Sequence, residues 1–335
     1  MTSPISTTLA RLGHRGTSTI GDRLALQRRG TAIILIAIVL AASVRYGSAF
    51  YWGINPTSFF DDTVKYALIA LAMTFVIMTG GIDLSVGSIV LLAGVVAAQL
   101  SSFGLVASLL GGLATGAAVG AINGALIAYG RLEPFVVTLA AMLWARGLGL
   151  QLASAQTTIM DSTNPLLALG STDWFGLSAL TWLMFAAFAI GAFVLKYFAW
   201  ARRILAIGGS EESAELLGVR TTNTKFSVYV LSGALAGLAG IVLAAQTGSV
   251  STDTGNGWEL IAIAAVVVGG TLLTGGIGSV IGTLIGLLLL QLIFNVIVFE
   301  NGLGTVQISS YWQSIIRGAF LLIVVLVQAR VGKKR

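Results

Sequence analysis

The sequence predicts an all-α membrane protein that crosses the bilayer many times, and its composition carries this prediction. Hydrophobic residues make up 56% of the 335 residues and charged residues only 10%, whereas an average chain is about 25% charged. The mean hydropathy is +0.93. Glycine is abundant, at 42 residues against 4 prolines, which suits helices that pack closely in lipid. These values exclude a soluble domain of this length.

The apolar segments are best counted as ten, each read against a hydrocarbon layer of about 30 Å. We expect the spans at Thr31–Tyr46, Asp62–Thr79, Leu84–Ser101, Leu105–Tyr129, Pro134–Ala153, Trp174–Phe198, Phe226–Thr247, Trp258–Thr274, Ile277–Phe299 and Trp312–Arg330. Residues 31–330 then form a single transmembrane domain. A basic tail (1–30) precedes it and a short tail (331–335) follows it.

The distribution of positive charge predicts the orientation of these spans. If the N-terminus is cytoplasmic, 15 of the 19 Lys and Arg residues fall on the inner side. Five lie in the N-terminal tail, one beside the fourth span, five around the loop 199–225 and four at the C-terminus. The outer loop from Ser154 to Asp173 carries none. This asymmetry follows the positive-inside rule, so we expect both termini in the cytoplasm.

Several kinds of chemistry are excluded by residue type. The chain has no cysteine, so it forms no disulfide and no cysteine-ligated metal site. The only histidine, His14, lies in the polar N-terminal tail, which leaves no histidine base or metal ligand for the membrane. The tail has no apolar core, so we do not expect a cleavable signal peptide.

The segment from Thr79 to Ser88 interrupts the apolar sequence between the second and third spans, and it contains Asp83, Ser85 and three glycines. A carboxylate within an apolar segment is costly unless it faces a partner or a water-filled path. One interpretation is therefore a helix break along a translocation path, lined by Thr79, Asp83, Ser85 and Ser88. The other is a polar turn in which Asp83 caps a helix that starts at Leu84.

The tetrapeptide Thr79–Ile82 recurs as Thr274–Ile277, again at an inner-side break between two spans. Membrane transporters are often built from repeated halves with interrupted helices around the substrate path. We therefore expect the two breaks to face one another across a path.

The longest polar stretch between spans, residues 199–225, predicts a short cytoplasmic helix. Ser210 is a suitable N-cap, Glu211 and Glu212 complement the helix dipole in the first turn, and Gly218 is a natural stop.

A helix of two turns is marginal alone, so it needs a surface to pack against. Ala214, Leu217 and Val219 offer apolar contact. The helix either docks a cytoplasmic partner or only orders its own loop.

Other polar residues within the spans have both structural and functional interpretations. Asn123 lines a path or bonds neighbouring helices. Arg146 must pair or face water, and we expect a structural ion pair with a carboxylate such as Glu259. Gln291 and Asn295 are four residues apart on one helix face and are expected to line a polar surface.

Two stretches resemble the sugar-type permeases of bacterial ATP-binding cassette (ABC) importers, such as the ribose, xylose, arabinose and galactofuranose systems. The run Met73–Ser88 resembles their characteristic segment. Glu212-Ser213-Ala214 followed by Gly218 is similar to the E-A-A-x-x-x-G pattern with which importer permeases dock on their ATPase. Ser213 replaces the middle alanine of that pattern.

The C-terminal half matches the same family. The segments Trp258–Thr271 and Gly275–Gly278 are similar to it, although Ile261 stands where relatives usually have aspartate. The resemblance covers the chain from the second span to the tenth.

The resemblance implies the type II importer fold and the import of a monosaccharide such as a pentose or galactofuranose. It also implies a bacterial inner-membrane dimer, with itself or a paralogue, two ATPase subunits below it, and a periplasmic or lipid-anchored sugar-binding protein above it. The chain lacks a Gly-x-x-x-x-Gly-Lys-Ser/Thr loop. It is thus expected to bind no cofactor itself, with ATP and Mg²⁺ used by the partner ATPase.

Within this resemblance, Ser210, Glu211, Glu212, Ala214 and Gly218 are expected to couple the permease to the ATPase. The gate interpretation of Asp83 is favoured over simple capping.

Two other classes of protein fit the sequence less well. An ion-coupled secondary transporter would need paired acids within the membrane, and the acids of this chain are isolated. A membrane enzyme would need a metal or nucleophile cluster, and no such spacing appears.

Overall fold

The computed structural model of the chain describes residues 19–47 and 56–302, together with single positions between 309 and 322. These residues are almost entirely helical. The helices are α2 (Thr19–Tyr46), α4 (Pro56–Met78), α5 (Val86–Gln99), the 3-10 helix η1 (Leu100–Phe103), α6 (Leu105–Ala128), α7 (Pro134–Leu152), α8 (Leu166–Ser171), α9 (Ala179–Tyr197), α10 (Ala199–Gly209), α11 (Glu211–Leu216), α12 (Thr221–Thr247), α13 (Trp258–Val268) and α14 (Val280–Gly302).

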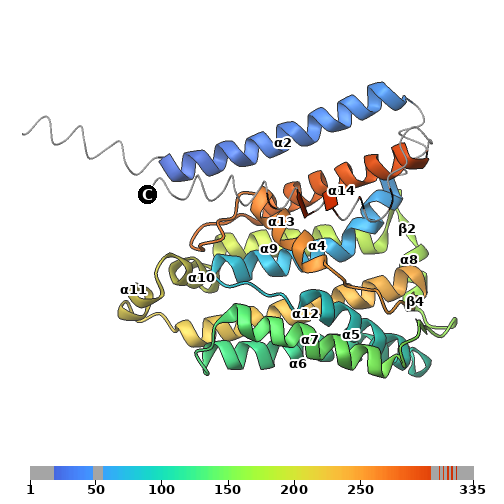
Figure 1. Ribbon diagram of the computed structural model, residues 1–335, viewed down its shortest axis with the longest axis horizontal. Helices are drawn as coiled ribbons and strands as arrows, with labels where there is room; N and C mark the ends of the chain where they lie inside the picture. The colour runs from blue at the N-terminus through green and yellow to red at the C-terminus, as the bar shows by residue number, and fades with distance from the viewer. Residues whose placement is uncertain are drawn as a thin grey trace, which may run out of the picture.

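Two antiparallel ladders of two residues per strand lie at the end of the bundle opposite α11 (Figure 1). β1 (Thr158–Ile159) pairs with β4 (Ser249–Val250), and β2 (Asp173–Trp174) pairs with β3 (Leu177–Ser178). They tie loops together and form no layer of their own.

Seven helices of the described chain are long and apolar enough to cross a membrane, namely α2, α5 with η1, α6, α7, α9, α12 and α14. α4 is also 23 residues long, although it carries Asp61, Asp62 and Lys65 in its first half. The all-helical, multi-span prediction is therefore confirmed. Most of the predicted tenth span, most of the N-terminal tail and the C-terminal tail fall outside the residues that the structure describes.

The predicted span at Trp258–Thr274 is wrong as a complete crossing. α13 has only 11 residues, which corresponds to roughly 16 Å of helix. It ends at Val268 because Gly269 and Gly270 follow, and Gly270 has the left-handed φ of +90°. The chain then runs without regular structure to α14.

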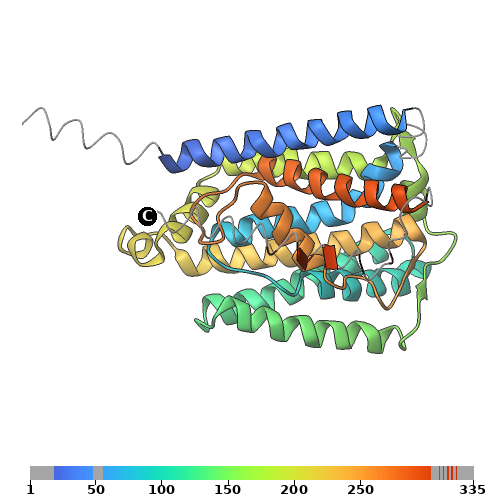
Figure 2. The ribbon, with the colours of Figure 1, turned by 45° about the horizontal axis from the view of Figure 1, so that its top comes forward.

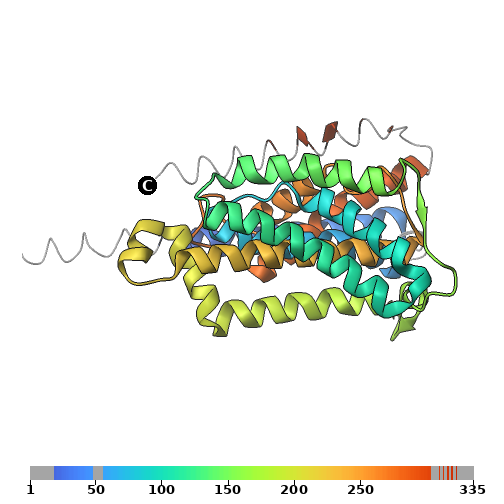
Figure 3. The same ribbon diagram turned by 90° about the horizontal axis from the view of Figure 1, so that it is seen from below.

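The core is centred on α12, which packs against α4, α5 and α6. Figure 3 shows α7 and α9 on opposite sides of the bundle, with α6 and α12 between them. α6 and α12 approach closely through glycines. A Cβ atom on Gly120 would lie 2.3 Å from the carbonyl oxygen of Tyr229, and one on Gly233 would lie 2.2 Å from that of Gly116. The high glycine content thus serves close helix packing.

α2 lies along the outside of the bundle beside α14 (Figures 1 and 2). The Thr31 hydroxyl donates to the Val268 carbonyl at 3.1 Å. Near the other end of α2, Arg45 pairs with Glu300 at 2.9 Å. Ile33 and Leu40 of α2 are at least 60% exposed, as expected for side chains that face lipid.

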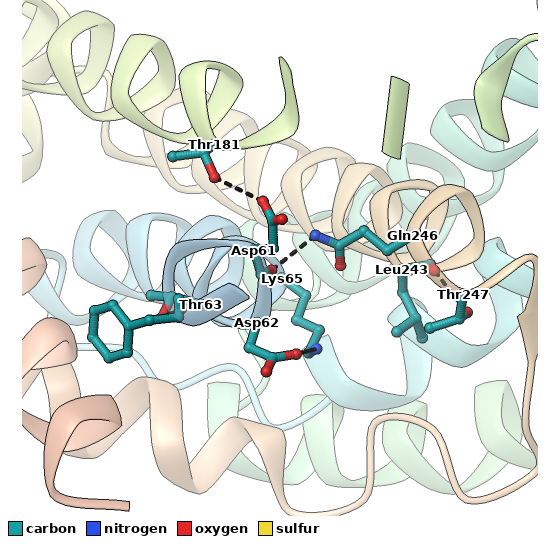
Figure 4. A network of polar contacts seen from close by, with 9 residues as sticks. Asp61, Asp62, Thr63, Lys65, Thr181, Leu243, Gln246 and Thr247 are labelled. Carbon is teal, nitrogen blue, oxygen red and sulfur yellow. Dashed lines mark hydrogen bonds and ion pairs between the residues drawn. The ribbon is translucent and has the colours of Figure 1, made fainter. Parts of the chain in front are cut away.

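Asp61 joins three helices at the end remote from α11 (Figure 4). Its carboxylate accepts from the hydroxyls of Ser178 and Thr181, the latter at 2.9 Å. Its main-chain carbonyl accepts from the Gln246 amide at 2.8 Å. Asp61 therefore anchors α4 to α9 and α12.

Candidate functional site

The two helix breaks meet directly. The first is the segment 79–85 between α4 and α5, and the second is the segment 269–279 between α13 and α14. The Gly276 N–H donates to the Met78 carbonyl at 3.0 Å, and a Cβ atom on Gly275 would lie 2.7 Å from the Gly80 nitrogen. The breaks were expected to face each other across a path. Here they are in contact, because glycine lets the two backbones touch.

α10 packs on both breaks through Gly208. A Cβ atom at this position would lie 2.0 Å from the Met78 carbonyl oxygen and 2.3 Å from the Gly276 nitrogen. A Cβ atom on the next residue, Gly209, would have no neighbour within 4 Å among the described residues. We call Gly80, Gly208, Gly275 and Gly276 the glycine junction. It connects the helix that leads into α11 with both breaks.

The short helix predicted in the loop 199–225 is present as α11. The Ser210 hydroxyl accepts the Ser213 N–H at 3.2 Å, as an N-cap does. Gly218 has a φ of +78°, which is the left-handed conformation of a helix stop. The local sequence chemistry therefore decided where this helix starts and ends.

α11 is held on α12 by its acidic residues. Lys225 pairs with Glu211 at 2.5 Å, and the Thr221 hydroxyl donates to Glu215 at 2.6 Å. Ala214 is only 2% exposed.

The opposite face of α11 is open. Leu216 and Leu217 are each 84% exposed. α11 projects from one end of the bundle in Figure 1. Two adjacent exposed apolar side chains on a projecting helix are typical of a surface that binds another protein.

A cavity of about 540 Å³ lies between α11, α12 and the first break. Thr79, Gly80 and Gly81 line it together with charged residues of both signs. The charged residues are Arg131, Glu133, Glu211, Glu212, Glu215 and Lys225. The cavity therefore gives water access to the first break from the α11 end.

Asp83 lies beyond this cavity, fully buried, at the centre of a hydrogen-bonded cluster. One carboxylate oxygen accepts the Ser85 N–H at 3.0 Å and the Ser85 hydroxyl at 2.5 Å. The other accepts the Ser232 hydroxyl of α12 at 2.7 Å. The Asn123 amide of α6 donates to Ser85 at 2.9 Å. The cluster thus ties the first break to α6 and α12.

Asp83 combines features of both interpretations made from the sequence. It accepts a backbone N–H where α5 begins, as a capping residue does. However, α5 starts at Val86 rather than Leu84. The bond to Ser232, which is 149 residues away in sequence, is not part of a cap.

Tyr229 and Ser232 are the site residues that sequence reasoning missed. The hydroxyl of Tyr229 is buried, lies 2.4 Å from the position of a Cβ atom on Gly81, and has no hydrogen-bond partner among the described residues. The Asn123 amide oxygen is buried and unpartnered in the same sense. The sequence could have indicated both residues, because a tyrosine and a serine lie within an apolar span and buried hydroxyls normally need hydrogen-bond partners.

The other residues expected to line a path lie in different places. Thr79 and Ser88 are buried. Thr79 lines the cavity between α11 and the first break, and Ser88 lies in the first turn of α5. Gln291 and Asn295 line a separate cavity between α4 and α14, in the half of the bundle remote from α11.

The expected ion pair between Arg146 and Glu259 is not formed. Arg146 donates instead to the carbonyls of Thr252 at 3.0 Å and Thr254 at 3.3 Å. The loop before α13 lies against α7, so its main-chain carbonyls, and not the Glu259 carboxylate, accept the hydrogen bonds of the guanidinium.

A bundle of membrane-length helices with two breaks and a projecting acidic helix defines a multi-pass membrane transport protein. Residues 55–325 match the family described as "Branched-chain amino acid transport system / permease component", and the chain belongs to this family. It is the permease component of an ABC importer, so the ion-coupled secondary transporter is no longer a candidate.

Three curated relatives are similar along most of their length. The ribose import permease protein RbsC of Escherichia coli (strain K12) is 38% identical over 303 residues, which cover 88% of this chain and 90% of that protein. The L-arabinose ABC transporter permease protein AraH of Azospirillum brasilense is 36% identical over 260 residues, with coverage of 77% and 75%. The fructose import permease protein FruG of Bifidobacterium longum (strain NCC 2705) is 33% identical over 325 residues, with coverage of 92% of each. No solved structure matches the chain at a significant level.

These findings confirm the resemblance to sugar-type ABC permeases that the motifs around Asp83 and Gly218 indicated.

Proposed function

We propose that this chain forms the membrane path for a neutral monosaccharide in a bacterial ABC importer. The family description names branched-chain amino acids, whereas the relatives compared above are named for ribose, L-arabinose and fructose. The similarity to these sugar permeases extends over three quarters or more of each chain, which favours a sugar.

The glycine junction is the observation that carries the mechanism. A partner ATPase binds the exposed face of α11, with Ser210, Glu211, Glu212, Ala214 and Gly218 forming the docking element. Closure of the ATPase pair displaces α11 and α10. Because Gly208 is packed on Met78 and Gly276 without space between them, the displacement moves both breaks.

The Asp83 cluster acts as the gate of the first break in this proposal. Thr79, Asp83, Ser85, Ser88 and Asn123 close the break while it is at rest. Moving the break relative to α12 separates Asp83 from Ser232, and the cavity beneath α11 is then continuous with the centre of the bundle.

The proposed assembly contains a second permease subunit, either a copy of this chain or a paralogue. ATP and Mg²⁺ belong to the two ATPase subunits. A periplasmic or lipid-anchored sugar-binding protein delivers the substrate at the end remote from α11. Positive charges near α11, such as Arg202, Arg203 and Arg131, support a cytoplasmic location for that end and for both termini.

The test is gentle purification of the tagged chain from its native membrane, followed by identification of the proteins that accompany it. We expect an ATP-binding subunit with the wild type and its loss with Gly218→Arg, since a bulky side chain at φ +78° distorts the end of α11. Uptake of pentoses and hexoses should be lost in parallel.

Gly176→Arg is the matched control. Gly176 has a φ of +80° and open space around it, like Gly218, but it lies in the β2–β3 turn at the other end of the bundle. It should retain the ATPase. Equal recovery of the ATPase with both variants, together with normal uptake by Gly218→Arg, would exclude α11 as the docking element.

A further inference from the structure

The cavity between α4 and α14 has a volume of about 270 Å³ and lies in the half of the bundle remote from α11. We call it the α4–α14 hollow. Since one water occupies about 30 Å³ of liquid, this space suits a small solute. Its lining includes Asp62, Lys65, Tyr66, Gln291, Phe294 and Asn295.

The α4 side of the hollow is charged but balanced. Lys65 pairs with Asp62 at 3.2 Å, so the two charges compensate. Figure 4 shows this pair turned away from the neighbouring Asp61, whose carboxylate is engaged by Thr181. Asp62 and Lys65 therefore line the hollow as a pair without net charge. A neutral ligand can hydrogen-bond to such a pair without separating the two charges.

The α14 side supplies two amides one helical turn apart, Gln291 and Asn295. The amide nitrogen of Gln291 is buried and has no hydrogen-bond partner among the residues that the structure describes. A buried donor without an acceptor is unfavourable, and a ligand oxygen at this position would satisfy it.

Aromatic rings complete the lining. Tyr66 packs against Trp258 with ring centroids 4.7 Å apart, which fixes the tyrosine ring, and Phe294 contributes from α14. Hydroxyl groups both donate and accept hydrogen bonds, so amides, a carboxylate and an ammonium group can all bind them. The C–H faces of a sugar ring can pack on the aromatic rings.

From these features, we propose that the α4–α14 hollow is a transient binding site for a neutral monosaccharide within the permease, with Gln291 and Asn295 bonding its hydroxyls. The proposal rests on the proposed function and adds a location and a chemical basis for sugar preference. A zwitterionic amino acid would need two separate charged partners, whereas Asp62 and Lys65 are already paired.

Thiol labelling tests the site in the complete complex in membrane vesicles. The chain has no cysteine, so Val298→Cys, at a lining residue without a proposed bond to the sugar, places a single thiol in the hollow, and Ser162→Cys places one in an exposed loop. A small water-soluble thiol reagent should modify both. The transported sugar should slow modification of Val298→Cys at least about threefold, as expected from near-saturation of a site that the sugar shields. L-leucine should not, and Ser162→Cys should be unaffected by either.

A second test removes one hydrogen-bonding group without changing size. Gln291→Met should reduce sugar uptake about tenfold, the kinetic equivalent of one lost hydrogen bond. Leu290→Met is the control, because Leu290 is a neighbouring buried residue of similar volume, and it should transport normally. Uptake by the two variants is compared at equal amounts of folded protein in the membrane.

The outcomes separate the two proposals. If the wild type takes up sugar but Gln291→Met is fully active and no sugar protects Val298→Cys, the binding site is excluded and the proposed function stands. Protection by L-leucine alone would also overturn the sugar site. If the wild type takes up none of a panel of pentoses and hexoses that includes D-ribose, L-arabinose and D-fructose, both proposals fail.

Discussion

Asp83 illustrates how a carboxylate is accommodated inside a membrane protein. It is fully buried, and its oxygens are satisfied by the Ser85 N–H and by the hydroxyls of Ser85 and Ser232. Uncompensated, such a group would be very costly in lipid. Here the donors come from two distant parts of the chain, so the residue is both a structural tie and the proposed gate.

We expect Asp83→Ala to lower the free energy of unfolding by roughly 2 to 4 kcal/mol, because three donors lose their acceptor. Ser232→Ala removes only one of these bonds and should cost about 1 kcal/mol. Thermal unfolding of the purified complex measures both. Wild-type stability of Asp83→Ala combined with loss of transport would show that Asp83 acts as a gate residue and not as a tie.

Among the elements, α10 and α11 together contact α12 and both helix breaks. α11 alone is too short to be stable, and Lys225 and Thr221 of α12 hold it in place. α10 reaches the breaks through Gly208. A displacement at α11 is thus applied to rigid backbone rather than to flexible side chains.

Gly208→Ala should uncouple ATP hydrolysis from uptake. The added Cβ would lie 2.0 Å from the Met78 carbonyl oxygen, and backbone atoms cannot yield as a flexible side chain can. We expect sugar uptake to fall at least about tenfold while the ATPase still co-purifies. The measurement is uptake and ATP hydrolysis in proteoliposomes that contain the complex and its binding protein.

Gly209→Ala is the control for this experiment, because nothing lies within 4 Å of its added Cβ and alanine favours the helix. Similar uptake by the two variants would mean that the glycine junction does not transmit the movement.

At the scale of the whole molecule, stability depends on close contact between helices. α6 and α12 touch through Gly116, Gly120 and Gly233. In lipid, such packing replaces the hydrophobic driving force that soluble proteins use. The glycines are therefore part of the core even though they bury no side chain.

Gly120→Ala should reduce the yield of monodisperse protein, since overpacking a tight interface costs about 1 to 3 kcal/mol. Its Cβ would lie 2.3 Å from the Tyr229 carbonyl oxygen. The added Cβ of Gly147→Ala on α7 meets no atom of the described residues within 4 Å, so this variant should behave as the wild type. Size-exclusion chromatography of detergent extracts measures both, and equal profiles would contradict the packing role.

Local patterns in the sequence determined the membrane class, most helices and the short helix α11. Apolar segments such as Leu105–Tyr129 predict a span because a helix of fixed rise must match the bilayer. Ser210 and Gly218 predict the bounds of α11 because capping is chemistry between residues close in sequence.

Only the tertiary structure decided what these elements contact. Hydropathy cannot distinguish a full span from the half-length α13, because an apolar helix is equally stable in lipid and inside protein. The bond from Ser232 to Asp83, the packing of Gly208 on Met78 and Gly276, and the donation by Arg146 to loop carbonyls join residues far apart in sequence. Such contacts depend on how the helices pack, and this packing cannot be predicted from patterns of residues close in sequence.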